Sequence, residues 1–286
     1  VRLKHNLNFV NVALPEEQAY IFQIVIPAPP KSSTALRTIL ESKLEENVPI
    51  PSAEATFDYE IIKVDEEGNC VVNVVVYTHS IVADYVYALR KGGFIPVAFE
   101  VEAQAIARAV LPYDHKTYMI VDFGSTRTGI AIVSDRTLRF TATVDVGGAP
   151  LTNVIRKHFN VGEEEADRIK NKHGFAKYKN NSELYDAFMG VVTALSAEIE
   201  KRYTYWNTRA PGGEKGKSTI EKITLCGGSS NLVGLPEYLG ATIDAPVERA
   251  NVWRNTLSFE EKIPPIENRK SLSYATSIGL SLRNFE

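Results

Sequence analysis

The chain has 286 residues, 44% of them hydrophobic and 23% charged, a composition that excludes a mainly disordered, collagen-like or coiled-coil protein. Its 32 basic and 35 acidic residues give a formal net charge of −3, and we expect no nucleic-acid partner because phosphate contacts usually need a basic excess. Two cysteines are too few for a disulfide scaffold, and no uncharged run reaches the ~18 residues of a membrane span. We therefore expect a cytoplasmic protein.

The first part of the chain is predicted to mix strands with helices. Apolar, β-branched runs predict strands, whereas apolar residues three and four apart predict helices. Strands are expected at residues 10–12, 20–26, 55–64, 70–78 and 94–101, and helices at 33–46, 79–91 and 103–110. The first helix has its apolar face at Leu36, Ile39, Leu40 and Leu44, with Ser33 or Thr34 as its cap. Residues 65–69 are expected to form a hairpin turn.

The second part continues the mixture from residue 117. Strands are expected at residues 117–122, 129–133, 137–146 and 220–225, and helices at 151–159, 163–172, 182–210, 231–239 and 272–282. Residues 211–218 are expected to form a flexible loop, and their resemblance to a phosphate-binding P-loop is rejected because that motif joins a strand to a helix. The mixture of elements predicts the α/β class.

Two glycine turns carry the chemistry that the sequence suggests. In the first, an apolar strand ends at Asp122 and is followed by Gly124 and by the hydroxyls of Ser125, Thr126 and Thr128. Glycine lets the backbone approach a phosphate, successive N–H groups and hydroxyls line anion pockets, and a carboxylate suits Mg²⁺ held through water. The same residues also suit an ordinary β-hairpin turn.

The second turn follows the strand at residues 220–225. Gly227, Gly228 and Ser229 lead from that strand toward an expected helix, whose N-terminus favours the anionic end of a nucleotide. A flat base or ribose can lie against glycine backbone. A plain strand-to-helix turn explains the pattern equally well.

Taken together, the two turns resemble the actin-like ATPases, and more closely the PilM family of type IV pilus assembly, with the FtsA division proteins as relatives. The resemblance extends over essentially all 286 residues. It is carried, in the family's order, by residues 14–18, 100–105, 122–128, 146–152 with 163–170, 227–239 and 274–280.

This resemblance implies an actin-like (ribonuclease H-like) two-domain ATPase fold. Residues 1–116 would form the remainder of the first actin-like domain. They would include, at about residues 8–73, the subdomain that PilM and FtsA proteins insert into this domain. The second would take residues 117–286, with the phosphate hairpin at 117–146, a small subdomain at about 151–218, the adenosine part at 219–270 and a last helix at 271–286 that returns to the first domain. The N-terminal strands and the first phosphate motif are missing, so we expect the chain to be a piece of a longer protein.

The resemblance also assigns residues to a site for ATP and Mg²⁺. The implied nucleotide-binding residues are Asp122, Gly124, Ser125, Thr126, Thr128, Gly148, Asp167, Lys170, Gly227, Gly228, Ser229 and Gly279. Of these, Asp122 would hold Mg²⁺ through water, while Asp167 and Lys170 would reach the ribose. Glu102 stands where the superfamily positions the attacking water, and is the implied catalytic residue.

Some assignments have an equally good plain interpretation. Glu102 also suits a solvated charge at a helix start, and Asp167 with Lys170 suits a surface pair at helical spacing. Thr126 replaces a glycine of the strict superfamily pattern, and Arg127 replaces a small hydroxyl residue. Arg127 would therefore either crowd the phosphates or give them a cation.

The function that the resemblance implies is a nucleotide-binding scaffold. Its ATP-bound state would dock the N-terminal peptide of a PilN-like bitopic membrane protein, and so hold the protein at the inner-membrane platform of the pilus. Whether it is an enzyme stays open, with at most weak ATPase activity expected, and so does self-association. The alternative is an FtsA-like or filament-forming actin-like ATPase of cell division or the cytoskeleton.

Overall fold

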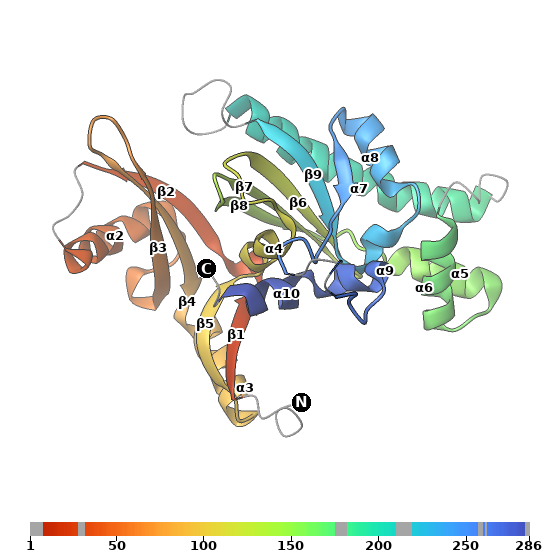
Figure 1. Cartoon of the computed structure of the whole chain (residues 1–286), viewed down its shortest axis with the longest axis horizontal. Coiled ribbons are helices and arrows are strands. Elements are labelled where there is room, and N and C mark those ends of the chain that lie inside the picture. The colour runs from red at the N-terminus through yellow and green to blue at the C-terminus, as the bar shows by residue number, and fades with distance from the viewer. Residues whose placement is uncertain are drawn as a thin grey trace. The chain divides into compact units, whose positions relative to one another are not determined.

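The computed structural model describes residues 8–27, 32–174, 182–209, 219–256, 260 and 262–283. The chain divides into two compact units, one formed by residues 1–102 with 139–141 and the other by residues 103–138 with 142–286. Helices and strands are mixed throughout (Figure 1), which confirms the α/β class. The expected loop at residues 211–218 lies outside the described residues, and the domain boundary at residue 116 stays a prediction.

The first unit contains a three-stranded antiparallel sheet in the order β2-β4-β3. Its strands are β2 (Tyr20–Ile26), β3 (Ala55–Val64) and β4 (Cys70–Thr78), close to the predicted ranges. The predicted turn joins β3 to β4. Within it Asp65 Oδ1 accepts hydrogen bonds from the N–H groups of Glu67 and Asn69 at 3.0 and 2.8 Å, and Gly68 supplies a positive φ of 84°.

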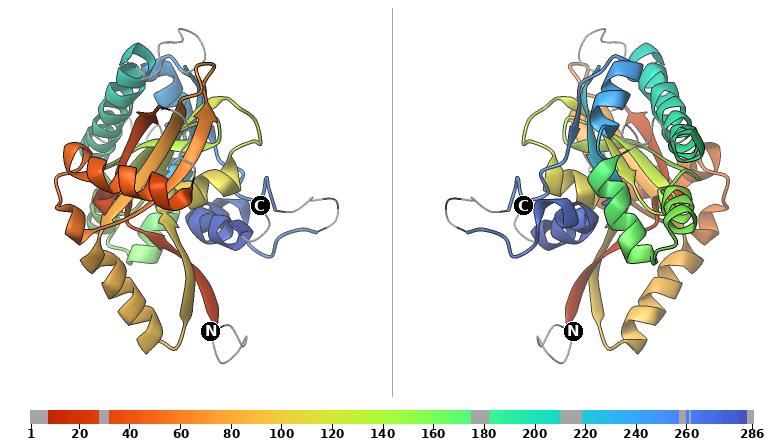
Figure 2. Two further views of the ribbon diagram at one scale, coloured as in Figure 1. Left: turned by 90° about the vertical axis from the view of Figure 1, so that its left-hand side faces the viewer. Right: turned by 90° about the vertical axis from the view of Figure 1, so that its right-hand side faces the viewer.

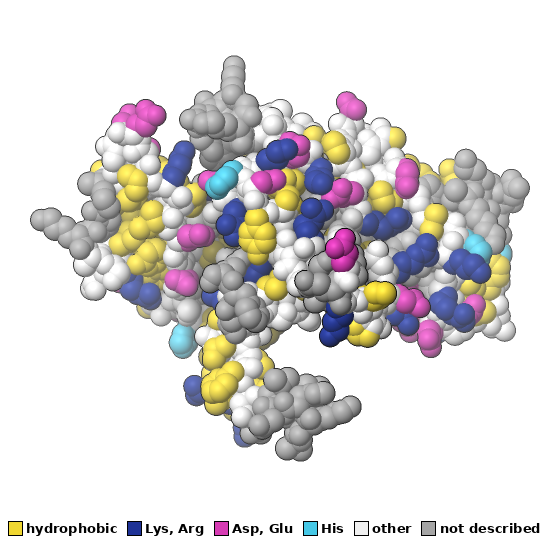
Figure 3. Space-filling view, in the orientation of Figure 1, with side chains coloured by type: hydrophobic (Ala, Val, Ile, Leu, Met, Phe, Trp, Pro, Cys, Tyr) yellow, Lys and Arg dark blue, Asp and Glu magenta, His cyan; other side chains and the backbone are white. Residues whose placement is uncertain are grey.

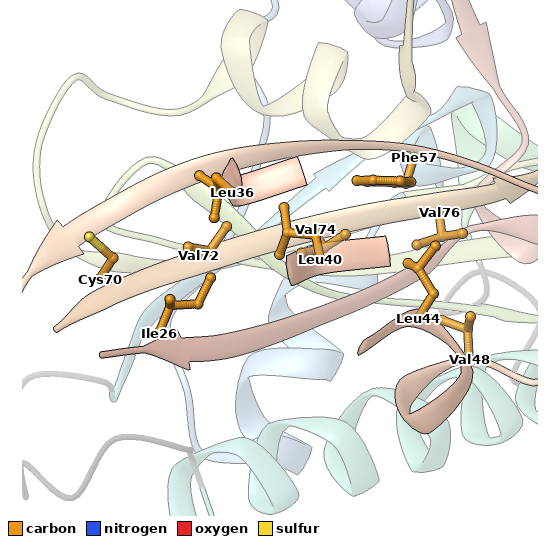
Figure 4. Packing of buried hydrophobic residues seen from close by; sticks show 10 residues of the cluster. All are labelled: Ile26, Leu36, Leu40, Leu44, Val48, Phe57, Cys70, Val72, Val74 and Val76. Carbon is orange, nitrogen blue, oxygen red and sulfur yellow. The ribbon is translucent and has the colours of Figure 1, made fainter. Parts of the chain in front are cut away.

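Helix α2 (Ser33–Asn47) covers one face of this sheet (Figure 2). Leu36, Leu40 and Leu44 point from the helix onto Val72, Val74 and Val76 of β4 (Figure 4). These leucines are at most 3% exposed, and burying each contributes about 2 kcal/mol. Two details of the prediction are wrong: Ile39 is 37% exposed because it lies off this stripe, and the N-cap is Ser32, whose Oγ accepts from Ala35 N at 3.2 Å.

A second, two-stranded sheet belongs to the same unit. It pairs β1 (Phe9–Leu14) with β5 (Ile95–Val101) in parallel, an arrangement that needs the long connection which the chain supplies between them. Helix α3 (His79–Lys91) leads from β4 toward β5. Residues 16–18 form the short 3₁₀-helix η1 (Glu16–Gln18).

The second unit is built on a five-stranded sheet in the order β10-β9-β6-β7-β8. Its strands are β6 (Thr117–Phe123), β7 (Thr128–Ser134), β8 (Thr137–Val144), β9 (Ile220–Cys226) and β10 (Val247–Arg249). Residues 139–141 of β8 are counted with the first unit. β6 pairs with β7 in antiparallel and with β9 in parallel. Asp135 and Arg136 join β7 to β8 with φ of 52° and 63°, the two positive values that a tight hairpin requires.

The helices of the second unit begin with α4 (Glu102–Val110), whose first residue is counted with the first unit. The others are α5 (Ala149–Phe159), α6 (Glu163–His173), α7 (Ser182–Arg209), α8 (Leu235–Ile243), α9 (Asn268–Ser271) and α10 (Ala275–Leu282). None of the described helices, including the long α7, combines the length and hydropathy needed to cross a membrane.

Two helices begin three or four residues later than the sequence predicted. The start expected at residue 231 is wrong: the 3₁₀-helix η4 (Gly228–Asn231) comes first, and Gly234, with φ of 87°, redirects the chain into α8. The last helix is likewise preceded by the 3₁₀-helix η5 (Leu272–Tyr274). In both places a tight turn, which apolar periodicity does not reveal, delays the α-helix.

Candidate functional site

The two glycine turns of the sequence lie side by side in the second unit. β6 and β9 are parallel neighbours, and Asp122 is paired with Cys226 at their carboxyl ends. Gly227, the next residue after Cys226, has φ of 83°, and a Cβ atom there would lie 2.4 Å from Asp122 Oδ1. The carboxyl ends of parallel strands are where open α/β sheets bind ligands. The two turns therefore lie next to each other at one edge of a single sheet.

The first turn is a tight hairpin between β6 and β7. Gly124 N donates to Arg127 O at 3.0 Å, which closes the turn. Ser125 and Thr126 are exposed, so their hydroxyls face the surroundings. Thr128 is fully buried, and its hydroxyl donates to Val146 O at 2.6 Å. Of the three hydroxyl residues of this turn, Ser125 and Thr126 are therefore the two that a ligand could reach.

The start of α5 holds this hairpin in place. Gly148 N donates to Gly124 O at 3.1 Å, and Ala149 N donates to Ser125 O at 2.8 Å. Gly147 allows the chain before α5 to lie this close to the hairpin, because a Cβ atom at this residue would lie 2.3 Å from Ser125 O. The first N–H groups of α5 are therefore bonded to the hairpin backbone.

Gly148 is also where α5 meets α6 and η4. A Cβ atom at Gly148 would lie 2.2 Å from Ser229 Oγ and 3.3 Å from Lys170 Nζ. Ser229 is 5% exposed and Lys170 3%, so both polar side chains are buried at this junction. Lys170 Nζ donates to Thr152 Oγ1 at 3.0 Å and lies 2.5 Å from Asp167 Oδ1. Asp167 and Lys170 form the ion pair that their helical spacing suggested. The lysine of this pair is buried, however, and does not lie on the surface as a plain surface pair would.

A cavity of about 460 Å³ opens beside this junction. Its walls come from α6, η4, α9 and η5, and include Asp167, Lys172, Gly228, Asn231, Arg269 and Ser273. Lys and Arg side chains gather on this face of the molecule (Figure 3). The volume is in the range of small-molecule sites, and the mixture of acidic, amide and basic walls suits a polar ligand with anionic groups.

The wall at η4 is fixed by side chains that sequence patterns do not single out. Asn231 Nδ2 donates to Gly228 O at 3.1 Å and to Arg269 O at 2.7 Å. Arg249 donates through Nε to Ser230 O and through Nη2 to Leu232 O, both at 2.9 Å. Burial lowers the pKa of Arg249 from its usual value, but an arginine stays charged. Neither residue belongs to a recognisable local motif, so only the fold reveals them.

The structure thus brings most of the expected residues into one region of the second unit. Asp122 and the hairpin contact Gly227, while Gly148, Lys170 and Ser229 meet on the other side of the same glycine turn. Gly279 serves a different contact: it lies on α10 against α4, where a Cβ atom would be 1.7 Å from Ala105 O. Glu102 belongs to the first unit.

Solved structures resemble this architecture. The structure described as the PilM-PilN type IV pilus biogenesis complex matches with a TM-score of 0.77 and 21% identity, over 100% of this chain and 83% of that one. MreB5 of Spiroplasma citri bound to ADP matches with a TM-score of 0.53 and 15% identity, over 73% of this chain and 66% of that one. The chain has the actin-like fold, as its sequence predicted.

The family follows from the sequence itself. The family described as type IV pilus assembly protein PilM matches residues 1–285, and the chain belongs to it. The cell division protein FtsA of Buchnera aphidicola subsp. Baizongia pistaciae (strain Bp) is 26% identical in an alignment of 238 residues that covers 73% of this chain. The match spans 55% of the length of that FtsA.

Proposed function

We propose that the protein is a nucleotide-binding scaffold of type IV pilus assembly, and that its nucleotide is ATP with Mg²⁺. The observation that carries this proposal is the contact between the two glycine turns, with Asp122 against Gly227 at the ends of β6 and β9. The cavity beside Gly228 and Asp167 has the size and polarity for an adenosine. The similar MreB5 structures, described as bound to ADP and to AMPPNP, support the class of ligand.

Each part of the ligand has its candidate residues. The exposed hydroxyls of Ser125 and Thr126 would meet the phosphates, and Asp122 would hold Mg²⁺ through water. In the described part of the chain no three His, Cys, Asp or Glu side chains gather as a metal site. The direct ligands of the ion would therefore be water molecules, one or more of them held by Asp122, and phosphate oxygens.

The proposed partner is a PilN-like bitopic protein of the inner membrane, which would dock by its N-terminal peptide. The similar PilM structure is described as a complex with PilN. In the first unit, β2 and β3 are the edge strands of their sheet, and they expose Val25, Ile61 and Val64. An edge strand with exposed apolar residues suits an extended peptide that binds by strand addition. This partner would keep a cytoplasmic protein at the pilus platform.

Calorimetric titration of the full protein with Mg-ATP tests the nucleotide site. We expect binding that Asp122→Asn weakens at least tenfold in Mg²⁺ but much less in EDTA, because the carboxylate acts through the ion. Asp84→Asn, an exposed aspartate on α3, is the matched control and should change nothing. Absence of Mg-ATP binding to the unaltered protein would refute the site.

The scaffold role is tested with a fluorescent N-terminal peptide of the PilN-like protein from the same organism. We expect tighter peptide binding when Mg-ATP is present, because ligand and peptide would favour the same conformation. Steady phosphate release in many turnovers, without peptide, would instead identify an ATPase of the FtsA-like or filament-forming kind.

A further inference from the structure

The β6–β7 hairpin has one buried face and one partly exposed face. In this antiparallel pair Phe123 lies opposite Thr128, and Asp122 lies opposite Gly129. Phe123 and Thr128 are both fully buried. Because side chains alternate between the two faces of a strand, Asp122 and Gly129 belong to the other face, where both are partly exposed. The carboxylate proposed for Mg²⁺ therefore lies on the accessible face of the hairpin.

Arg127 continues this accessible face. Gly124 N donates to Arg127 O at 3.0 Å, so the pairing of the two strands extends by one residue toward the turn. By the same alternation, Gly124 and Arg127 fall on the face of Asp122. In agreement, Arg127 is exposed while the adjacent Thr128 is buried. Asp122 and Arg127 are thus diagonal neighbours on one face, a spacing that long side chains can bridge.

Glycines stand opposite both charged residues. Gly129 is paired with Asp122, and Gly124 with Arg127. Apart from its chain neighbours, a Cβ atom at Gly124 would have only the backbone of Arg127 within 4 Å. Of these four paired residues, all of which the structure describes, two are glycines, one is acidic and one is basic. Such a face lets a ligand lie against backbone between two opposite charges.

The two charges suit the two parts of a metal-bound phosphate group. A carboxylate holds Mg²⁺ through water but repels the phosphate oxygens. A guanidinium does the reverse, since its planar donors match two phosphate oxygens at once. An arginine on the face of Asp122 therefore supplies the attraction for phosphate that the carboxylate lacks.

We propose that Arg127 binds the phosphates of the nucleotide directly and gives the site a fixed cation in addition to Mg²⁺. Because actin-like proteins commonly have a small hydroxyl residue at this position, this contact is a property of the present chain. The inference rests on the proposed function, which assigns the hairpin to phosphate. It predicts that Arg127 contributes to binding of the phosphates and not of the nucleoside, and that it contributes most when Mg²⁺ is absent.

The first test is calorimetric titration of the full protein with ATP and with adenosine. Arg127→Gln removes the charge, Arg127→Lys keeps it, and Arg156→Gln changes an exposed arginine on α5 as the matched control. We expect Arg127→Gln to weaken Mg-ATP about tenfold and adenosine less than about twofold. Arg127→Lys should lose only about threefold, because it keeps the charge but not the paired donors. Arg156→Gln should change neither affinity.

Metal dependence distinguishes Arg127 from Asp122. In EDTA the phosphates carry more uncompensated charge, so the loss in Arg127→Gln should grow beyond tenfold, whereas the loss in Asp122→Asn should shrink. Unchanged or tighter Mg-ATP binding by Arg127→Gln would show that Arg127 crowds the phosphates or competes with the metal, and would overturn the inference. Equal losses for adenosine and Mg-ATP would overturn it too, since they indicate a general effect on the fold.

The second test needs neither a variant that folds nor a nucleotide. Inorganic pyrophosphate is added to the unaltered protein, and the Nε–H signals of its arginine side chains are followed by NMR. We expect the Arg127 signal to shift in a saturable way while that of Arg156 stays in place. No shift at Arg127 would overturn the inference. Failure of the unaltered protein to bind Mg-ATP would instead refute the proposed function, and pyrophosphate would still decide whether Arg127 binds phosphate.

Discussion

Gly227 lies with its Cα against the carboxylate of Asp122, so close that a Cβ atom would fall 2.4 Å from Asp122 Oδ1 and 2.6 Å from Phe123 O. Gly227 also has a φ of 83°, a backbone conformation that residues other than glycine rarely adopt. Both the backbone conformation and the space beside the candidate metal-binding carboxylate therefore require glycine at this position.

We predict that Gly227→Ala abolishes measurable Mg-ATP binding and destabilises the second unit by roughly 2 kcal/mol or more, through steric overlap and a strained φ. Urea unfolding and calorimetry would measure the two effects. Gly190→Ala is the matched control, because a Cβ atom at Gly190, on α7, meets nothing within 4 Å. It should stabilise by about 0.5–1 kcal/mol, as expected for alanine in a helix. Undiminished affinity in Gly227→Ala would contradict the close contact.

The crossing of α4 and α10 depends on a second glycine. At Gly279 a Cβ atom would lie 1.7 Å from Ala105 O, and Arg108 Nη1 donates to Gly279 O at 3.1 Å. We predict that Gly279→Ala forces the two helices apart and costs roughly 2–4 kcal/mol of folding stability. Thermal unfolding would show a lowered midpoint, again with Gly190→Ala as reference. Equal midpoints for the two variants would mean that α4 and α10 do not approach as described.

Elements with a strong local signal were predictable from the sequence. The β-branched run of β4 and the four-residue spacing of Leu36, Leu40 and Leu44 predicted the hairpin and α2 almost residue by residue. The reason is physical: each pattern follows from the local conformation of the element itself. The glycine turns at Gly124 and Gly227 were predictable for the same reason, since each follows directly on a buried strand.

Features that depend on distant contacts could not be predicted in this way. Lys170 is buried because α5 and η4 close over the face of α6 that it shares with Ala166, whereas Lys172 of the same helix is exposed. Arg249 and Asn231 hold the η4 turn by bonds to backbone carbonyls elsewhere in the chain. The start of α8 at residue 235 depends on the conformation of Gly234, which apolar spacing does not encode.

The core of the first unit offers a direct test of side-chain burial. Leu40 is fully buried beneath the β2–β4–β3 sheet, while its neighbour Ile39 is 37% exposed. We predict that Leu40→Ala destabilises this unit by roughly 2–5 kcal/mol, through lost burial and a residual cavity. Ile39→Ala, the control one residue away, should cost less than about 1 kcal/mol. Hydrogen exchange of the β4 amides would measure the loss of stability in each variant. Equal losses would mean that α2 does not pack on the sheet through the face that carries Leu40.

The turn between β3 and β4 is expected to make the stability of that hairpin depend on pH. The pKa of Asp65 lies below its usual value of 3.8, chiefly because the Asn69 side chain and then its backbone N–H donate to the carboxylate. A carboxyl whose pKa is lowered by folding stabilises the folded state above its unfolded pKa. That stabilisation is lost as the pH falls through the folded pKa, so we expect the hairpin to loosen only below about pH 4.

NMR titration of the Asp65 carboxyl carbon, with exchange of the Asn69 amide followed in parallel, would measure this. Asp65→Asn is the control, because an asparagine keeps an oxygen acceptor for the turn but does not titrate in this range. Exchange rates of the Asn69 amide are first corrected for the intrinsic pH dependence of exchange. Between pH 5 and pH 3 the corrected rate should stay constant in Asp65→Asn, whereas it should rise in the unaltered protein. A titration midpoint above 3.8 would contradict the hydrogen bonds on which this turn depends.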